Sequence, residues 1–209
     1  MLHLNTIDDT VYNLLLRLTS SGYLNHFALA GGTSLALQIG HRKSIDLDLF
    51  AFGEVNMYEI SLLLENEFTT ISIRRTSPAF IFCHINAIKC DFVNHSKHKL
   101  INPCFTHDGI RMFSVEDIAA MKLNAICGRG SKKDFYDIYS LLQLFSLKEL
   151  LGFYDYKFQS DNSWMALRSM QYFEDADTQE EPELVKPFPE WSKIKILLTK
   201  TVNDFKFDD

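Results

Sequence analysis

The segment LAGGTSLALQIGHRKSIDLDLF, residues 29–50, is the part of the chain that decides the fold. An apolar run enters the glycine pair Gly31-Gly32, which predicts a buried strand followed by a tight turn. Residues 33–39 suit a short helix, and the alternation of apolar and acidic residues over 45–50 predicts a second strand. We therefore expect a strand, a glycine turn, a helix and an acidic strand in close succession.

The acidic strand carries the first candidate catalytic residues, Asp46 and Asp48. Side chains two positions apart on a strand share one face, roughly 6.5–7 Å from each other. Two carboxylates on one face repel each other, and a divalent cation such as Mg²⁺, or Mn²⁺ in its place, removes that repulsion. Asp91 lies on a later strand, 88–93, and supplies a third carboxylate if the two strands are neighbours. Three acids can hold two metal ions for an in-line phosphoryl displacement, so all three are candidate metal ligands.

The glycine turn is a candidate phosphate-binding site. Backbone N–H groups at the start of a helix attract anions, and glycine allows a phosphate to approach the main chain. Thr33 and Ser34 add hydroxyl groups, and Arg42 lies in the basic loop that leads to the acidic strand. We expect Gly31, Gly32, Thr33 and Ser34 to form a phosphate site.

The remaining pattern divides the chain into a mixed half and a helical half. Helical spacing is expected at 8–21 and 55–68, and strands at 71–76, 79–86 and 88–93, before a loop that contains Pro103 and Gly109. From Ser114 onward the pattern predicts helices at 114–127, 132–145, 147–154, 161–174 and 190–204, with a loop over 174–190. The fold class is therefore α+β, a mixed β-sheet core with flanking helices over 1–110 followed by an all-helical domain over 111–209.

The composition is that of an ordinary soluble protein, and together with the cysteines and the N-terminus it predicts a cytoplasmic location. It has 209 residues, 46% of them hydrophobic, and a net charge of −6, so no global basic field indicates nucleic-acid binding. A local basic rim or bound cations can still serve a polyanionic substrate. The four cysteines, Cys83, Cys90, Cys104 and Cys127, form no CxxC pair and suit a reducing compartment. The N-terminus lacks the pattern of a signal peptide, and no apolar run is long enough to span a membrane.

Two segments together resemble a known family. Residues 29–50 are similar to the signature of the DNA polymerase β-type nucleotidyltransferase superfamily, and more narrowly to its AbiEii/AbiGii-type toxin branch of abortive-infection and toxin–antitoxin systems. That branch has a glycine turn, an Arg-x-Ser/Thr loop and an Asp-Leu-Asp strand. The segment SVEDIAAMKLNAICGRGSKKDFYDIYSLL, residues 114–142, is similar to the branch's helical motif. The matching positions there are Lys122, Arg129, Lys133, Asp134 and Asp137.

The resemblance covers roughly 27–145 and implies a nucleotidyltransferase-like core closed by a helical domain. It implies Mg²⁺-dependent transfer of a nucleotidyl group from an NTP, with a tRNA end or a protein side chain as acceptor and a cognate antitoxin as possible partner. It also implies that the glycine turn holds the triphosphate of that NTP, with Arg42 paired to it. Lys122 is expected to stabilise the triphosphate, together with Arg129 and Lys133. Asp134 either orients Lys122 or accepts the proton of the attacking hydroxyl.

Alternatives remain open at this level. The protein could be a catalytically silent nucleotide-binding regulator, or it could transfer the nucleotidyl group to a small cationic molecule of the aminoglycoside type. Asp108 is a weaker rival of Asp91 for the third acid. The histidines His41, His95 and His98 are expected to be surface residues rather than general bases.

Overall fold

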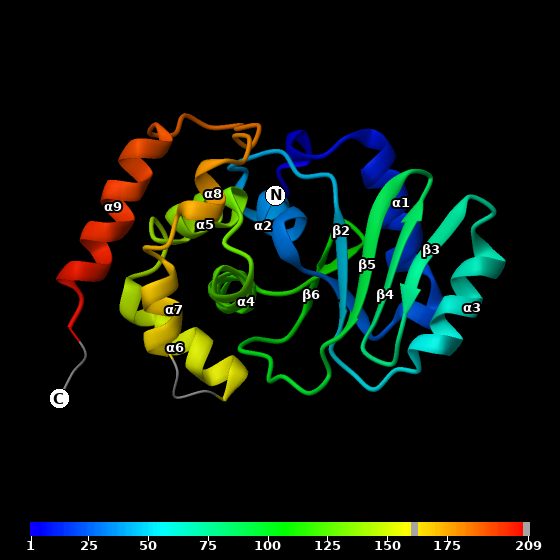
Figure 1. Cartoon of the computed structure of the whole chain (residues 1–209). Coiled ribbons are helices and arrows are strands. Elements are labelled where there is room, and N and C mark those ends of the chain that lie inside the picture. The colour runs from blue at the N-terminus through cyan, green and yellow to red at the C-terminus, as the bar shows by residue number, and fades with distance from the viewer. Residues whose placement is uncertain (160–162, 207–209) are drawn as a thin grey trace.

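The computed structural model describes residues 1–159 and 163–206 (Figure 1). Within these ranges the strands form one mixed sheet in the order β3-β4-β5-β2-β1-β7-β6. The strands are β1 (Phe27–Leu29), β2 (Leu47–Ala51), β3 (Ile71–Thr76), β4 (Phe80–Ile85), β5 (Ile88–Asn94), β6 (Phe105–His107) and β7 (Ile110–Met112). The pairs β2–β5 and β1–β7 are parallel, and the other neighbours are antiparallel.

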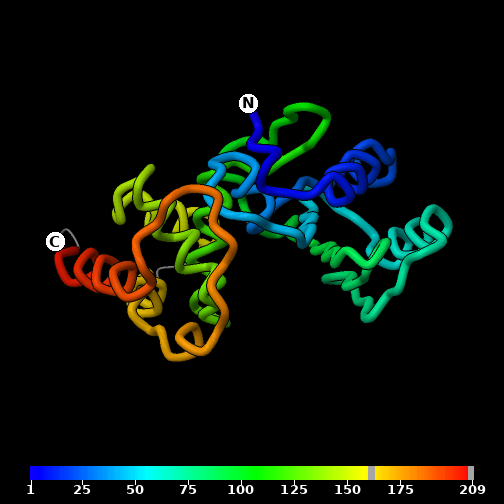
Figure 2. The backbone as a smooth tube through the Cα atoms, turned by 90° about the horizontal axis from the view of Figure 1, so that it is seen from above, coloured from blue at the N-terminus to red at the C-terminus, as the bar shows by residue number. Residues whose placement is uncertain are grey.

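The helices gather mainly at one end of the molecule. They are α1 (Asp9–Ser20), α2 (Gly31–Ile39), α3 (Met57–Glu67), α4 (Val115–Gly128), α5 (Lys132–Leu141), α6 (Leu147–Phe158), α7 (Ser163–Ser169), α8 (Glu174–Asp177) and α9 (Trp191–Asp204). Figures 1 and 2 show α4 to α9 at one end, and the β3–β4 edge of the sheet with α3 at the other. None of the described helices is long and apolar enough to cross a membrane.

Alternation along β2 separates the two faces of the sheet. Leu47, Leu49 and Ala51 are buried in a core that α1 and α3 cover, whereas Asp48 and Phe50 are half-buried on the opposite face. Period two places Phe50 with Asp48, so it packs against the second core, on the side of the helical half.

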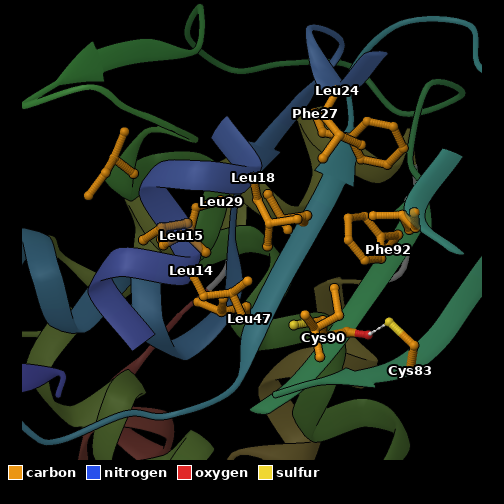
Figure 3. Packing of buried hydrophobic residues seen from close by; sticks show 14 of the residues in the cluster. Leu14, Leu15, Leu18, Leu24, Phe27, Leu29, Leu47, Cys83, Cys90 and Phe92 are labelled. Carbon is orange, nitrogen blue, oxygen red and sulfur yellow. Dashed lines mark hydrogen bonds between the residues drawn. The ribbon is translucent and has the colours of Figure 1, made fainter. Parts of the chain in front are cut away.

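The core under α1 is closely packed. Leu14, Leu15 and Leu18 form one helical face, as their spacing predicts, and they pack beside Leu47 on the sheet (Figure 3). Phe27 and Phe92 meet edge to face at 5.9 Å between ring centres. Apolar burial of this kind contributes about 25 cal/mol per Å² removed from water, so this face fixes the strand register from which the opposite face is built.

A second core joins the helical half to the sheet. It consists largely of residues from Phe113 onward, and Ala28, Ala30 and Leu35 contribute to it from the first half of the chain. Trp191 of α9 stacks on Tyr136 of α5 with ring centres 5.8 Å apart. The helical half is therefore fastened to the strand–turn–helix segment that carries Gly31.

The hairpin β6–β7 was missed, since the sequence suggested only a loop there. Asp108 and Gly109 both have positive φ angles, 50° and 77°, and they form the tight turn between the two short strands. An Asp-Gly pair is a known hairpin signal, and it was present in the sequence. Strands of three residues are too short for alternation to be visible, which explains the omission.

The C-terminal third also differs from the expected helices. The single helix expected at 161–174 is replaced by α7 and the short α8, with residues 160–162 outside the described ranges. The expected loop over 174–190 begins with α8 and continues as residues 178–190, here called the strap. The strap runs along the top of Figure 1 between α8 and α9. Its Leu184 forms an isolated antiparallel bridge with Arg42, so it is bound to the basic loop.

Candidate active site

Two of the predicted acids lie side by side at the centre of the sheet. Asp48 of β2 and Asp91 of β5 are direct partners in the parallel register, on the face opposite the α1–α3 core. Lys89 Nζ lies 2.7 Å from Asp91 Oδ2. The other carboxylate oxygen, Asp91 Oδ1, is buried without a hydrogen-bond partner in the described part of the chain. Burial raises the pKa of Asp48; the Asp91 charge adds to this rise, and Lys122 opposes it.

The glycine turn touches this acid pair. Gly31 has a φ of +65°, and a Cβ added to it would lie 2.1 Å from Asp48 Oδ2. Ala30 N donates to the carbonyl oxygen of Asp48 at 2.8 Å, which holds the turn against β2. Glycine is needed here both for the backbone conformation and for space. The positive N-terminal end of α2 therefore adjoins the Asp48 carboxylate.

The hydroxyl groups of the turn point into the protein. Thr33 and Ser34 are 1% and 0% exposed. Thr33 Oγ1 donates to the carbonyl oxygen of Asp46 and lies 2.8 Å from Ser44 Oγ, while Gln38 Nε2 donates to Ser34 Oγ at 3.0 Å. These hydroxyls stabilise the turn and are not open to a phosphate, contrary to the sequence-based expectation. Any contact of this turn with an anion would come from its main chain.

Asp46 is separated from the other two acids. It lies one residue before β2, and its carboxylate is 3.5 Å from Lys133 Nζ. It lines a cavity of about 720 Å³ between the basic loop and the strap, whereas Asp48 and Asp91 line another of about 500 Å³. Among the described residues, no group of three or more His, Cys, Asp or Glu side chains is arranged to hold a metal ion. Asp48 and Asp91 therefore form a pair, and Asp46 lies in a separate cavity, so the three acids do not form one metal site in this structure.

The acid pair nevertheless fits a divalent cation. Mg²⁺ is usually held by one or two carboxylates together with substrate phosphates and waters, not by a cage made of protein alone. The unpartnered Asp91 Oδ1 is an oxygen that such an ion would satisfy. Asp48 and Asp91 would be its protein ligands.

Lys122 faces the acid pair from α4. Its side chain is 5% exposed, and Nζ lies 2.8 Å from Asp134 Oδ1 and 2.6 Å from Asp137 Oδ2. Burial alone would lower the pKa of this ammonium group, but Asp137 and Asp134 outweigh burial and raise it. An ammonium group has three N–H donors, so one remains for a ligand in the cavity that Lys122 lines.

The Arg42 side chain is buried and paired with Asp137. Its Nε and Nη2 donate to the two oxygens of Asp137 at 2.7 and 2.9 Å, and its side chain is 4% exposed. Nη2 also abuts the glycine turn, since a Cβ on Gly32 would lie 2.4 Å from it. The structure assigns Arg42 to fixing the turn against α5, whereas the sequence suggested a direct contact with triphosphate.

Asp134 orients Lys122 and Arg129. Its carboxylate is 0% exposed, and Arg129 Nε donates to Oδ2 at 3.0 Å. Burial alone would raise the pKa of Asp134, but Lys122 and then Arg129 outweigh burial and lower it. A buried carboxylate with a lowered pKa is a poor proton acceptor. Of the two roles that the sequence allowed for Asp134, the geometry therefore favours orientation.

Asp137 was named from the sequence as a matching position of the helical motif, but the sequence assigned it no role. It accepts hydrogen bonds from both Arg42 and His41, pairs with Lys122 and is 0% exposed. Burial would raise its pKa, but Arg42 and Lys122 hold it well below the usual range. Its position three residues after Asp134 puts both carboxylates on the inner face of α5, and this spacing was the available signal.

Two of the three histidines are not surface residues, contrary to expectation. His41 is 2% exposed, with Nε2 donating to Asp137 Oδ1 at 2.6 Å, because the strap covers its loop through Val185 N and the His41 carbonyl. His95 is 7% exposed, packed beside Phe50. His98 is exposed, as predicted. Asp108 lies in the β6–β7 turn and lines neither of the two cavities, so Asp91 and not Asp108 accompanies Asp48.

Comparison with known proteins identifies the family of the chain. Residues 13–204 match the model of the family described as nucleotidyl transferase AbiEii toxin, type IV TA system. An uncharacterized protein of Aquifex aeolicus is 34% identical over 194 residues, covering 90% of this chain and 92% of that protein.

Two solved structures share the fold. JHP933 from Helicobacter pylori superposes with a TM-score of 0.51 at 15% identity, covering 94% of this chain and 92% of that chain. The nucleotidyltransferase toxin MenT4 of Mycobacterium tuberculosis superposes with a TM-score of 0.50 at 14% identity, covering 92% of this chain and 80% of that one. At such low identities the two structures show only that the fold is shared. The family match over most of the chain shows the family. The chain therefore belongs to the AbiEii nucleotidyl transferase toxin family of type IV toxin–antitoxin systems.

Proposed function

We propose that the protein transfers a nucleotidyl group from an NTP to an RNA acceptor, such as a tRNA end, or to a protein acceptor, with a divalent cation bound at Asp48 and Asp91. In this proposal it is the toxin of a two-component system and is neutralised by a cognate antitoxin. One observation carries the proposal: the in-register acid pair lies against Gly31 at the start of α2, with Lys122 and Arg129 lining the same cavity.

Each part of this arrangement matches one need of the reaction. The N-terminus of α2 and the main chain at Gly31 suit phosphate oxygens. Arg129 and Lys133 have side chains that are 60% and 44% exposed, so they can reach a triphosphate. Lys122 is held between two carboxylates and keeps its charge for the departing pyrophosphate.

The reaction would proceed by in-line displacement. An acceptor hydroxyl oxygen bonds to the α-phosphorus, the bond from that phosphorus to the β-phosphate oxygen breaks, and pyrophosphate leaves with the electron pair. A bound Mg²⁺ or Mn²⁺ supplies charge neutralisation at the phosphates. The hydroxyl proton passes to solvent water in the cavity, because in this proposal Asp91 Oδ1 binds the cation and Asp91 Oδ2 is paired with Lys89.

Asp46 enters this scheme only through Lys133. In the structure its carboxylate is 3.5 Å from Lys133 Nζ. A triphosphate would compete for this lysine, and the released Asp46 carboxylate would then be available to the cation. We therefore keep Asp46 as a ligand of the loaded enzyme rather than of the free one.

The test is transfer from labelled ATP, CTP, GTP or UTP to total tRNA or to cell protein, with and without Mg²⁺. We expect metal-dependent labelling by the wild type and its loss in Asp48→Asn. The matched control is Asp177→Asn, which removes an exposed carboxylate that pairs with Lys195 and does not line the cavity of the acid pair. Labelling that persists in Asp48→Asn, or that is absent for every nucleotide and acceptor, contradicts the proposal.

A further inference from the structure

The cavity of the acid pair has a second, aromatic end. Beyond Asp48 and Asp91 the 500 Å³ cavity is bordered by rings, those of Phe50, His95, His98 and Phe158. Phe82 and Met121 also line the cavity, and Phe82 lies beside the acids, as the cross-strand partner of Asp91. None of them has a role in the phosphate chemistry proposed above.

The order of these side chains follows from the strands. On β2, Phe50 comes two positions after Asp48 and shares its face, and on β5 Val93 comes two positions after Asp91. The next position on that face is His95, just past the end of β5. Because β2 and β5 are parallel, both steps lead away from the acids in the same direction, by roughly 6.5 Å per two residues. The cavity therefore continues from the acids past Phe50 to His95, which leaves room for a ligand to extend in this direction.

His95 has an unsatisfied polar atom at this end of the cavity. The side chain lines the cavity, the residue is 7% exposed, and Nε2 is buried without a hydrogen-bond partner among the described residues. Buried polar groups in folded proteins almost always have a partner, so this nitrogen calls for one that the protein itself does not supply.

The surroundings of His95 are those of a stacking site. Its ring centre is 5.4 Å from that of Phe50, 4.4 Å from that of His98 and 6.3 Å from that of Phe158. Burial, with smaller contributions from Lys157 and His98, lowers the pKa of His95 to about 3. The imidazole is therefore neutral at physiological pH and can either donate or accept one hydrogen bond at Nε2, according to its tautomer.

We propose that this end of the cavity binds a nucleobase, which lies against the ring of Phe158 and forms a hydrogen bond with His95 Nε2. The inference rests on the proposed function, since the phosphates fix which end of the ligand reaches the rings. A planar heterocycle with polar edges fits both the aromatic rings and the unpartnered His95 Nε2, because the face of a base stacks on aromatic side chains and its edge forms hydrogen bonds. The base can come from the donor NTP or from the terminal nucleotide of an RNA acceptor.

The experiment measures binding by calorimetry in the full-length protein with Mg²⁺. The titrants are each of the four NTPs, inorganic triphosphate, and a short single-stranded RNA. His95→Phe removes the ring nitrogens and keeps an aromatic side chain, and Phe158→Leu removes the ring and keeps apolar volume. His84→Phe is the control, since His84 shares the sheet face of Phe82 on β4 but lies outside the cavity.

We expect His95→Phe to weaken the preferred NTP roughly 2- to 12-fold, as one hydrogen bond predicts, and to reduce discrimination among the four bases. Phe158→Leu should weaken NTP binding by roughly 5- to 150-fold, as loss of a stacking partner predicts. Inorganic triphosphate, which has no base, should bind both variants as it binds the wild type. Since His95→Phe removes an unpaired buried nitrogen, its melting temperature should not fall, which separates a binding role from a structural one.

The outcomes are distinguishable. Weaker NTP binding with unchanged triphosphate binding assigns the site to the donor base. Unchanged NTP binding with weaker RNA binding assigns it to the acceptor base. If neither ligand responds to either variant, the nucleobase site is refuted. If inorganic triphosphate fails to bind even the wild type, the proposed phosphate site is wrong, while the NTP and RNA titrations still decide the nucleobase site.

Discussion

Asp137 lies at the centre of a buried charge network with Arg42 and Lys122, and its replacement by asparagine tests whether that network holds the two halves together. The Asp137 carboxylate accepts hydrogen bonds from Nε and Nη2 of Arg42 at 2.7 and 2.9 Å, and one of its oxygens lies 2.6 Å from Lys122 Nζ. These three side chains are 0%, 4% and 5% exposed, so water cannot replace a lost partner. Asparagine keeps the shape but removes the charge and turns one acceptor into a donor that faces other donors.

The expected cost follows from this burial. Removal of one partner from a buried ion pair destabilises a protein by about 3–5 kcal/mol. For a chain of this length each kcal/mol lowers the melting temperature by about 2–4 °C, so we expect a fall of roughly 6–20 °C in Asp137→Asn. The network also fixes Lys122 and the glycine turn through Arg42, so transferase activity should fall with stability.

Urea and thermal unfolding, followed by circular dichroism, measure this cost. Asp177→Asn is the control, because Asp177 is an exposed carboxylate in an ion pair, and its loss should leave the midpoint almost unchanged. The folded pKa of Asp137 is depressed, so its stabilisation is present above its unfolded pKa, near 3.9, and is lost as pH falls through the folded value. The difference between wild type and Asp137→Asn should therefore shrink on acidification. An Asp137→Asn protein as stable as the wild type at pH 7 would refute this account of the network.

Three further predictions concern the glycine turn and the acids. Asp48→Asn should raise the melting temperature of the metal-free protein at neutral pH, since the raised pKa of Asp48 means that its charge is unfavourable in the fold. The gain should shrink as pH falls below the raised folded pKa and should vanish only below the unfolded pKa, near 3.9; a lower melting temperature at neutral pH would contradict the reasoning. Gly31→Ala should destabilise the fold by at least about 1–2 kcal/mol, because an alanine is strained at this positive φ, and it should abolish transfer. The control is Gly22→Ala, whose new Cβ has nothing within 4 Å, and it should change neither stability nor transfer in the same unfolding and labelling assays. Lys133→Ala should weaken binding of inorganic triphosphate with little change in stability, since its ion pair with Asp46 is largely exposed, and unchanged binding in calorimetry would remove Lys133 from the phosphate site.

The sequence was most informative where a short segment contains its own pattern. The glycine turn, the helix after it and the alternation on β2 are all local, and the structure has them within a residue or two of the expected bounds. The same holds for α4, where Ser114 caps the helix by accepting from Asp117 N. The site roles of Asp46, Asp48 and Asp91 remain predictions.

The sequence was least informative where a side chain's role depends on a distant partner. Arg42 and the Thr33 hydroxyl look like phosphate ligands in the sequence, because a basic residue and a hydroxyl near a glycine turn are typical of such sites. In the fold they are bound to Asp137 and to the Asp46 carbonyl. No local sequence pattern shows that Arg42 pairs with a carboxylate 95 residues later in the chain.

By itself the sequence determined the acidic strand, the glycine turn and the helical motif, because each follows from the periodicity and turn chemistry of a few consecutive residues. Only the tertiary structure decided that Asp48 meets Asp91 in register, that Asp137 gathers Arg42 and Lys122, and that His95 is buried at the far end of the cavity. The physical reason is that burial and pairing are set by which segments pack together. That packing fixes both the pKa of a carboxylate and the partners that remain for a ligand.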